Sequence, residues 1–187
     1  TIDDSVGETF DKVAKMVGMQ YPGGSYIEEK SKKGDGNRFK FPKPLELSGD
    51  FNFSFSGLKT AVKHEIDRTD IKDDQYIEDL CSSFQKTVIE ILTKKTESAI
   101  IYSKTKIPNL KNLVIAGGVA ANKKIKNSFE ELCKKNNLQL ISPSKNLCGD
   151  NAAMIAWACL QIYKLGYKGD LNFKPRPRWG LEELNNL

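Results

Sequence analysis

The sequence lacks the features that mark a membrane protein or a zinc protein. Its apolar runs are all shorter than the roughly 20 residues that span a bilayer, and no signal-peptide pattern opens the chain. Its four cysteines form no Cys-x-x-Cys pair, and its single histidine, His64, has no histidine cluster around it to complete a zinc set. These absences predict a cytoplasmic protein without a membrane partner, whose thiols stay reduced and mostly buried.

The net charge is small for the length of the chain. The 187 residues carry 29 basic and 24 acidic side chains, an excess of +5, and 39% of all residues are hydrophobic. This composition is typical of a globular protein, and the basic excess is compatible with contact to RNA without indicating it. The first residues lack a methionine and lead directly into helix-start residues. They predict a fragment whose first half is absent.

The stretch from Asn112 to Asn122 contains a glycine pair at a position that suits a ligand. An apolar run is followed by Gly117-Gly118 and then by a helical pattern, which predicts a strand over 113–116, a tight turn and a helix over about 120–135. Glycines allow positive φ and close approach of a ligand, and the next helix presents free N–H groups and a positive dipole end. A nucleotide fits this pattern. Packing alone is the alternative.

Hydrophobic periodicity predicts the other elements. Helices are expected over residues 5–17, 25–30, 57–68, 73–104 and 150–165. Strands are expected over 138–141 and over two alternating aromatic segments, 38–41 and 51–55, which are predicted to pair. The last helix is apolar nearly all round, which is typical of a helix buried between layers. The fold class predicted from these elements is α/β.

Several residues are expected to cap or stop these helices. Asp3 and Asp4 are predicted to cap the first helix and Gly18 to end it. Ser56 is predicted to cap the helix that follows it, and its Ser-x-x-Lys spacing to Lys59 matches a nucleophile pattern poorly. The cap is therefore the preferred interpretation, with a phosphate or RNA contact by Lys59 as the alternative.

Three residues near the start of the chain are candidates for ligand binding. Asp11 lies on the polar face of the first helix, where its carboxylate either pairs with Lys15 at the surface or accepts two hydrogen bonds from a ribose diol. Gly24 either turns the chain or leaves room for a ligand. Glu28, one helical turn further on, is expected to point at the same place.

Two further candidates come from the C-terminal part. Asp150 either caps the last helix or presents its carboxylate to a cation, because hard metal ions prefer oxygen ligands. The basic segment 173–179, which contains two prolines, either touches phosphates or pins the terminus.

Five motifs in register resemble the tRNA threonylcarbamoyladenosine transferase family, earlier described as O-sialoglycoprotein endopeptidases. The motifs are Asp-Asp-x-x-Gly-Glu-x-Phe-Asp-Lys at 3–12, Tyr-Pro-Gly-Gly at 21–24, Phe-Ser-Phe-Ser-Gly-Leu-Lys-Thr at 53–60, Ala-Gly-Gly-Val-Ala-Ala-Asn at 116–122 and Cys-Gly-Asp-Asn-Ala-Ala-Met at 148–154. The resemblance runs from the first residues to about Trp179 and corresponds to the C-terminal part of such a protein.

The resemblance implies an actin-like ATPase or sugar-kinase fold, with two α/β lobes around a nucleotide cleft. Residues 1–110 would form a helical and hairpin segment and residues 111–187 the nucleotide-binding α/β lobe, with the N-terminal lobe absent. The implied activity of the intact enzyme is transfer of a threonylcarbamoyl group from threonylcarbamoyl-AMP to the adenosine next to the anticodon of tRNAs that read codons beginning with A. The implied partners are tRNA, the threonylcarbamoyl-AMP synthase and accessory subunits.

The family's site residues carry over by motif. Asp11, Gly24, Glu28 and Asn122 would bind the adenylate, with Asp11 on the ribose, and Asp150 would be a metal ligand. The intact subunit is expected to hold one divalent metal, iron or zinc, with iron favoured by the resemblance. The family's His-x-x-x-His metal pair is missing from this sequence. We therefore expect this chain alone to bind nucleotide weakly, to hold little metal and to be inactive.

Two alternatives remain at this stage. A phosphotransferase of the same superfamily would share the Gly-Gly turn but would phosphorylate a small acceptor without tRNA. A noncatalytic partner subunit of the family would share the fold without the activity. The presence of Asp11, Asn122 and Asp150 together argues against the noncatalytic subunit.

Overall fold

The structure is a computed structural model that describes the chain except for residues 1–2, 71–72, 171, 173, 178 and 181–187. The chain forms two compact units, Thr1–Gly149 and Asp150–Leu187. The first unit contains five α-helices, two short 3-10 helices and two strands among its described residues, and the second contains α6. The predicted division of the chain near residue 110 stays a prediction.

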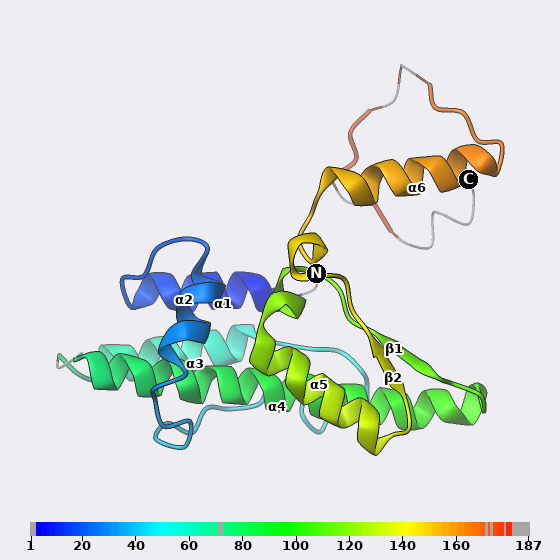
Figure 1. The fold of residues 1–187 in the computed structure, drawn as a ribbon. Helices are drawn as coiled ribbons and strands as arrows, with labels where there is room; N and C mark the ends of the chain where they lie inside the picture. The colour runs from blue at the N-terminus through cyan, green and yellow to red at the C-terminus, as the bar shows by residue number, and fades with distance from the viewer. Residues whose placement is uncertain (1–2, 71–72, 171, 173, 178, 181–187) are drawn as a thin grey trace. The chain divides into compact units, whose positions relative to one another are not determined.

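Helix α4, Asp74–Lys106, is the central element of the first unit (Figure 1). Its N-cap Asp73 accepts a hydrogen bond from the backbone N–H of Tyr76 at 2.7 Å. The predicted helix over 73–104 is confirmed to within two residues. Its apolar stripe forms the core together with α1, α2, α3 and α5, and includes the fully buried side chains of Leu80, Cys81, Phe84 and Val88.

Burial controls the chemistry of the core thiol. It raises the pKa of Cys81 to about 12, so this cysteine stays a protonated thiol at neutral pH. Cys133 and Cys148 are also buried and free, whereas Cys159 is exposed. The predicted free thiols are thus confirmed, and three of the four are buried.

Helix α1, Val6–Met16, lies within the predicted range but has a different cap. Ser5 is the N-cap, and its side chain accepts a hydrogen bond from the N–H of Glu8 at 3.3 Å. The prediction that Asp3 and Asp4 cap this helix is therefore wrong. Gly18, with φ of +78°, ends the helix as predicted, because the left-handed conformation there favours glycine.

Asp3 instead holds the start of α3, Ser56–Asp67. Its carboxylate accepts hydrogen bonds from the backbone N–H and the hydroxyl of Ser56, at 3.2 and 3.0 Å. The N-cap residue of α3 is Phe55, and Ser56 is the first helical residue, so the prediction of a Ser56 cap is also wrong. A carboxylate 53 residues away in the sequence satisfies this helix start.

The predicted hairpin of segments 38–41 and 51–55 is absent, and both segments are irregular. Their aromatic side chains pack on other parts of the first unit instead of on a paired strand. Phe39, for example, packs edge-on against Tyr76 of α4 with ring centroids 5.3 Å apart. In segment 38–41 the half-buried Phe39 and Phe41 alternate with the exposed Arg38 and Lys40, as in a strand, whereas Phe51 and Phe53 are both exposed, so the period of two was misleading here.

The α/β part consists of β1, Asn112–Val114, and β2, Gln139–Ile141, which pair in parallel with Leu113 opposite Leu140. Between them the chain forms the 3-10 helix η1, Gly118–Ala121, and then α5, Lys123–Lys135. The predicted order of strand, turn and helix is confirmed. The α-helix begins about three residues later than predicted, because the turn is followed first by η1.

The second unit contains helix α6, Ala152–Lys164. Asn151 is its N-cap and accepts a hydrogen bond from the N–H of Met154 at 3.0 Å, so the cap interpretation of Asp150 is wrong. The apolar side chains of α6, including Ile155 and Trp157, are not covered by other described residues of this unit, and the predicted burial of α6 between layers stays a prediction. Among the described residues of this unit, α6 is the sole helix or strand, so the unit holds no second layer to cover it.

Two further sequence predictions concern membrane-spanning helices and the basic C-terminal segment. Within the described ranges, no helix is long and apolar enough to cross a membrane. The basic segment 173–179 is only partly described, since Phe173 and Arg178 lie outside the described residues. In the part that is described, the guanidinium of Arg176 lies over the ring of Trp179, 4.9 Å from its centroid.

Asp4 joins α1 to α3 through two lysines. Its carboxylate accepts a hydrogen bond from Lys59 and another, at 3.0 Å, from Lys12. These bonds, first from Lys59 and then from Lys12, lower the pKa of Asp4 below its usual range. The ammonium of Lys59, considered above as a phosphate contact, is therefore engaged within the protein.

This ion pair predicts a specific pH dependence of stability. Asp4→Asn is expected to lower the free energy of unfolding by about 1 kcal/mol at pH 7, the scale of a partly exposed ion pair. Because the folded-state pKa of Asp4 is depressed, its stabilisation is present above the ordinary carboxyl pKa near 4 and is lost as the pH falls through the lower folded value. Urea unfolding should show the difference from wild type shrinking as the pH falls below about 4. The exposed Asp67→Asn variant is the control, and a pH-independent difference for Asp4→Asn would contradict the assignment.

Candidate substrate-binding site

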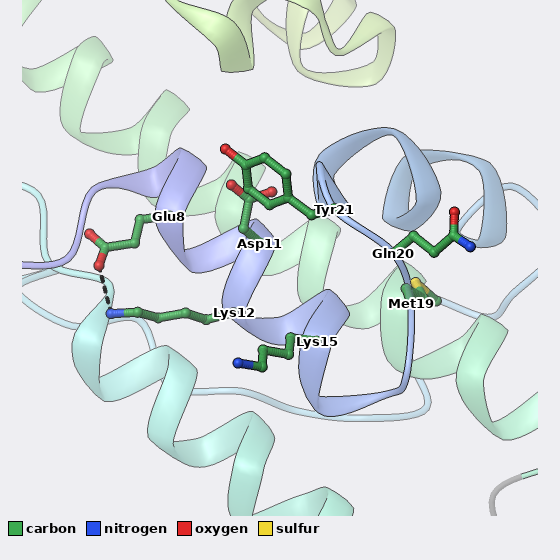
Figure 2. Close-up of a pocket in the computed structure, with 7 residues that line it drawn as sticks. All are labelled: Glu8, Asp11, Lys12, Lys15, Met19, Gln20 and Tyr21. Carbon is green, nitrogen blue, oxygen red and sulfur yellow. Dashed lines mark ion pairs between the residues drawn. The ribbon is translucent and has the colours of Figure 1, made fainter.

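A pocket of about 450 Å³ opens beside α1 in the first unit. Figure 2 shows the side chains that line it: Glu8, Asp11, Lys12, Lys15, Met19, Gln20 and Tyr21. Its volume lies within the range of pockets that take small molecules and cofactors. Asp11 points into the space beside the ring of Tyr21 (Figure 2). Asp11, the residue predicted to bind the ribose, thus lines a pocket of suitable size.

Asp11 also holds the start of helix α2, Gly23–Lys30. Its Oδ1 accepts a hydrogen bond of 2.7 Å from the backbone N–H of Gly23, the first residue of that helix. A carboxylate is favourable there because a helix N-terminus carries free N–H groups and partial positive charge. A carboxylate oxygen has more than one lone pair, and Oδ2 is not used in this bond, so Asp11 retains acceptors for a ligand.

The structure separates the roles of the two glycines. A Cβ on Gly23 would lie 2.3 Å from Cβ of Ala14, so this glycine is required where α1 and α2 cross. A Cβ on Gly24 would have nothing within 4 Å. Space is therefore open at Gly24, as the ligand-binding interpretation requires, and packing does not account for its missing side chain.

Glu28 contacts the helix that follows the Gly-Gly turn. Its Oε1 accepts a hydrogen bond of 2.8 Å from the backbone N–H of Lys123, the first residue of α5. The first N–H group of this helix is therefore engaged within the protein. Glu28 lies on α2 one turn after Gly24, as predicted, and its carboxylate is partly exposed while it holds α5.

Asn122 is largely buried, with 8% of its surface exposed, and serves as the N-cap of α5. Its Oδ1 accepts a hydrogen bond from the N–H of Ile125 at 3.0 Å, and its Nδ2 donates to Oε1 of Gln85 at 2.7 Å. A side-chain amide has two N–H donors and an oxygen with two lone pairs. One donor and one lone pair of Asn122 therefore remain for a ligand.

The Gly-Gly turn approaches the start of α1. Gly117 has φ of +90°, in the region that favours glycine, and its carbonyl accepts a hydrogen bond of 3.0 Å from the N–H of Ala120. A Cβ on Gly7 of α1 would lie 3.6 Å from a methyl carbon of Val119. The first unit thus contains four of the five predicted site residues, on α1, α2 and the start of α5.

Gln85 was not predicted from the sequence. It is fully buried on α4, where its amide contacts Asn122 and the hydroxyl of Ser31. The signal in the sequence is a polar residue within the apolar stripe of that helix, between Phe84 and Val88. Such a residue needs a hydrogen-bonding partner when it is buried.

Asp150, the predicted metal ligand, belongs to the second unit and is exposed. The part of the chain that the structure describes contains no group of three or more His, Cys, Asp or Glu side chains that could hold a metal ion. One carboxylate does not make a tight site for iron or zinc. The described residues therefore do not fit a metal centre by themselves.

Comparison with known proteins decides the family. Residues 1–157 match the family model described as tRNA N6-adenosine threonylcarbamoyltransferase (TsaD). The chain belongs to this family. All five predicted site residues lie within the matched segment, and the resemblance found from the sequence motifs is confirmed.

Relatives of that name align with nearly the whole chain. The protein from Rickettsia bellii (strain OSU 85-389) is 50% identical over 185 residues, which cover 98% of this chain and 54% of the relative. The protein from Chelativorans sp. (strain BNC1) is 46% identical over 187 residues, with 98% and 52% covered. The protein from Rickettsia rickettsii (strain Sheila Smith) is 48% identical over 188 residues, with 100% and 55% covered. The chain thus spans about half the length of the curated relatives it matches.

Proposed function

We propose that the complete protein transfers the threonylcarbamoyl group from threonylcarbamoyl-AMP to the adenosine next to the anticodon of tRNAs that read codons beginning with A. The observation that carries this proposal is the family match over residues 1–157, which includes the pocket lined by Asp11. The relatives carry the name of this transferase, which favours it over the phosphotransferase alternative. The actin-like ATPase fold and a cytoplasmic location are part of the same proposal.

In this proposal the first unit binds the nucleoside part of the adenylate. Asp11 accepts hydrogen bonds from the ribose hydroxyls with the lone pairs that Gly23 does not use. The open space at Gly24 admits the ligand close to the backbone. Asn122 contributes its remaining N–H, and Glu28 holds the start of α5 in place beside it.

The reaction is an acyl-type transfer. The exocyclic nitrogen of the tRNA adenine forms a bond to the carbamoyl carbon, the bond from that carbon to the phosphate oxygen breaks, and AMP leaves with the electron pair. The attacking nitrogen loses a proton. Residues that fix the adenylate increase the rate by orienting the carbamoyl carbon toward the incoming amine.

Asp150 is the proposed contribution of this chain to a metal site. Its exposed carboxylate suits iron or zinc as one oxygen ligand, and the other ligands would come from residues outside the described part of the chain. No step of the reaction is assigned to the metal. The threonylcarbamoyl-AMP synthase and accessory subunits are the proposed protein partners.

The proposal predicts a product that can be identified directly. The complete protein, incubated with tRNA, threonine, bicarbonate, ATP and the adenylate-forming partner, should yield threonylcarbamoyladenosine in digested tRNA by mass spectrometry. Gly24→Val should lower the yield about tenfold or more, because the added side chain fills the space that the ligand needs. Ser25→Ala, next to it on α2 and exposed, is the control and should leave the yield unchanged.

Two results would contradict the proposal. One is an absence of modified adenosine with the wild-type protein and its partner. The other is phosphorylation of a small acceptor without tRNA, which would support the phosphotransferase instead. If Gly24→Val modifies tRNA at the wild-type rate, the space at Gly24 is not part of the site.

A further inference from the structure

A buried line of hydrogen bonds connects two of the proposed substrate-binding elements through α4. Nδ2 of Asn122 donates to Oε1 of Gln85 at 2.7 Å, and Nε2 of Gln85 donates to Oγ of Ser31 at 2.7 Å. The hydroxyl of Ser31 in turn donates to the backbone carbonyl of Glu28 at 2.8 Å. We call these side chains, Ser31, Gln85 and Asn122, the amide relay.

The amide relay and the carboxylate of Glu28 form a closed ring. The backbone carbonyl of Glu28 ends the relay, and the side chain of Glu28 accepts the N–H of Lys123, the residue after Asn122. Helix α2 and the start of α5 are thus joined twice, once directly and once through α4. Two candidate site residues that are 94 positions apart, 28 and 122, are held at a fixed separation by this ring.

The order of donors and acceptors in the relay sets the orientation of Asn122. Its Oδ1 must face Ile125, since the backbone N–H there can only donate. Its Nδ2 therefore faces Gln85, which must present its oxygen there and its Nε2 to Ser31. A rotated amide at either position would break two buried hydrogen bonds, which is costly where water cannot replace them.

We propose that Gln85 is a positioning residue for the adenylate site, because it fixes the orientation and place of Asn122 relative to α2. This inference rests on the proposed function. Gln85 is 0% exposed, Ser31 3% and Asn122 8%, so Gln85 itself does not touch a ligand. It acts by directing the free N–H of Asn122 toward the adenylate.

The test measures AMP binding to the complete protein by calorimetry, together with kcat and KM for transfer. Gln85→Met keeps the length of the side chain and removes both hydrogen bonds. It should raise the Kd for AMP and the KM for the adenylate about tenfold, as expected when a ligand-contacting amide loses its fixed orientation. Ser31→Ala removes one hydroxyl and should raise the Kd about threefold. If Gln85→Met does not fold, Ser31→Ala tests the same relay.

Val88→Ala is the matched control, because Val88 is fully buried on the same helix and has no part in the relay. It should lower the melting temperature while leaving the Kd for AMP within about twofold of wild type. The double variant Ser31→Ala/Gln85→Met should bind AMP no more weakly than Gln85→Met, because residues of one hydrogen-bonded unit do not contribute additively.

The outcomes separate the two proposals. If the wild-type protein binds AMP and Gln85→Met binds it equally well, the positioning role is refuted and the proposed function stands. The same holds if Val88→Ala weakens binding as much as Gln85→Met at an equal loss of melting temperature. If the wild-type protein does not bind AMP at all, the result contradicts the proposed function itself, before any variant is compared.

Discussion

Gly34→Ala is expected to destabilise the first unit strongly. A Cβ at this position would lie 2.0 Å from the backbone oxygen and 2.2 Å from the backbone carbon of Glu78 in α4. It would also lie 2.5 Å from the backbone nitrogen of Asp79. The loop after α2 is held against α4 at this point, since the N–H of Asp35 donates to Oδ1 of Asp79 at 2.6 Å. The backbone of a helix cannot move aside as a side chain can, and we expect a loss of about 3 kcal/mol in the free energy of unfolding.

Gly36→Ala is the matched control in the same loop. A Cβ there would meet the side chains of Lys86 and Ser82, each at 3.3 Å, and both can rotate away. Thermal or urea unfolding of the two variants should show a large loss for Gly34→Ala and a small change for Gly36→Ala. Equal stability of the two variants would show that the loop does not lie against α4 in solution.

The second large effect is expected for Asp11→Asn in the complete protein. Asparagine retains an oxygen that can accept the N–H of Gly23, so α2 should keep its place. The charge and one carboxylate oxygen are lost, and with them the bonds proposed for the ribose hydroxyls. Transfer to tRNA should fall on the order of 10- to 100-fold, the range for losing charged hydrogen bonds, with a change in melting temperature within about 2 °C.

Two further variants distinguish ligand binding by Asp11 from its support of α2 and from a general effect of lost charge. Asp11→Ala should lower both transfer and melting temperature, because the N–H of Gly23 then loses its partner. Glu29→Gln changes an exposed carboxylate on α2 that pairs with Lys32, and it should leave transfer unchanged. Wild-type transfer by Asp11→Asn would mean that Asp11 serves only to hold α2.

Local sequence patterns were sufficient for the helices but not for the contacts that begin them. The apolar stripe of α4 and the glycine after α1 were predicted because period and stop signals act within a few residues. The start of α3 depends on Asp3, and that of α5 on Glu28, which is 95 residues from Lys123. Such partners are set by tertiary packing, and no local pattern contains them.

The candidate site also depends on tertiary contacts that local sequence patterns do not contain. The motifs predicted Asp11, Gly24, Glu28 and Asn122, and the structure places all four in one unit. They did not predict that Asp11 and Glu28 also hold helix starts, because that role depends on how α1, α2 and α5 meet, whereas the cap formed by Asn122 is a local contact with the N–H of Ile125. Gln85 was missed for a related reason, since its partners Ser31 and Asn122 are 54 and 37 residues away.

The carboxylates at the starts of α2 and α5 have a consequence for the selectivity of the site. Helix N-termini commonly attract phosphate groups, because their free N–H groups and positive dipole ends favour anions. Here Asp11 already occupies the first N–H of α2, and Glu28 that of α5. Their negative charges repel a second anion at these positions. We therefore expect these two helix starts to disfavour a phosphate group and to favour ligand groups that donate hydrogen bonds, such as hydroxyls and amines.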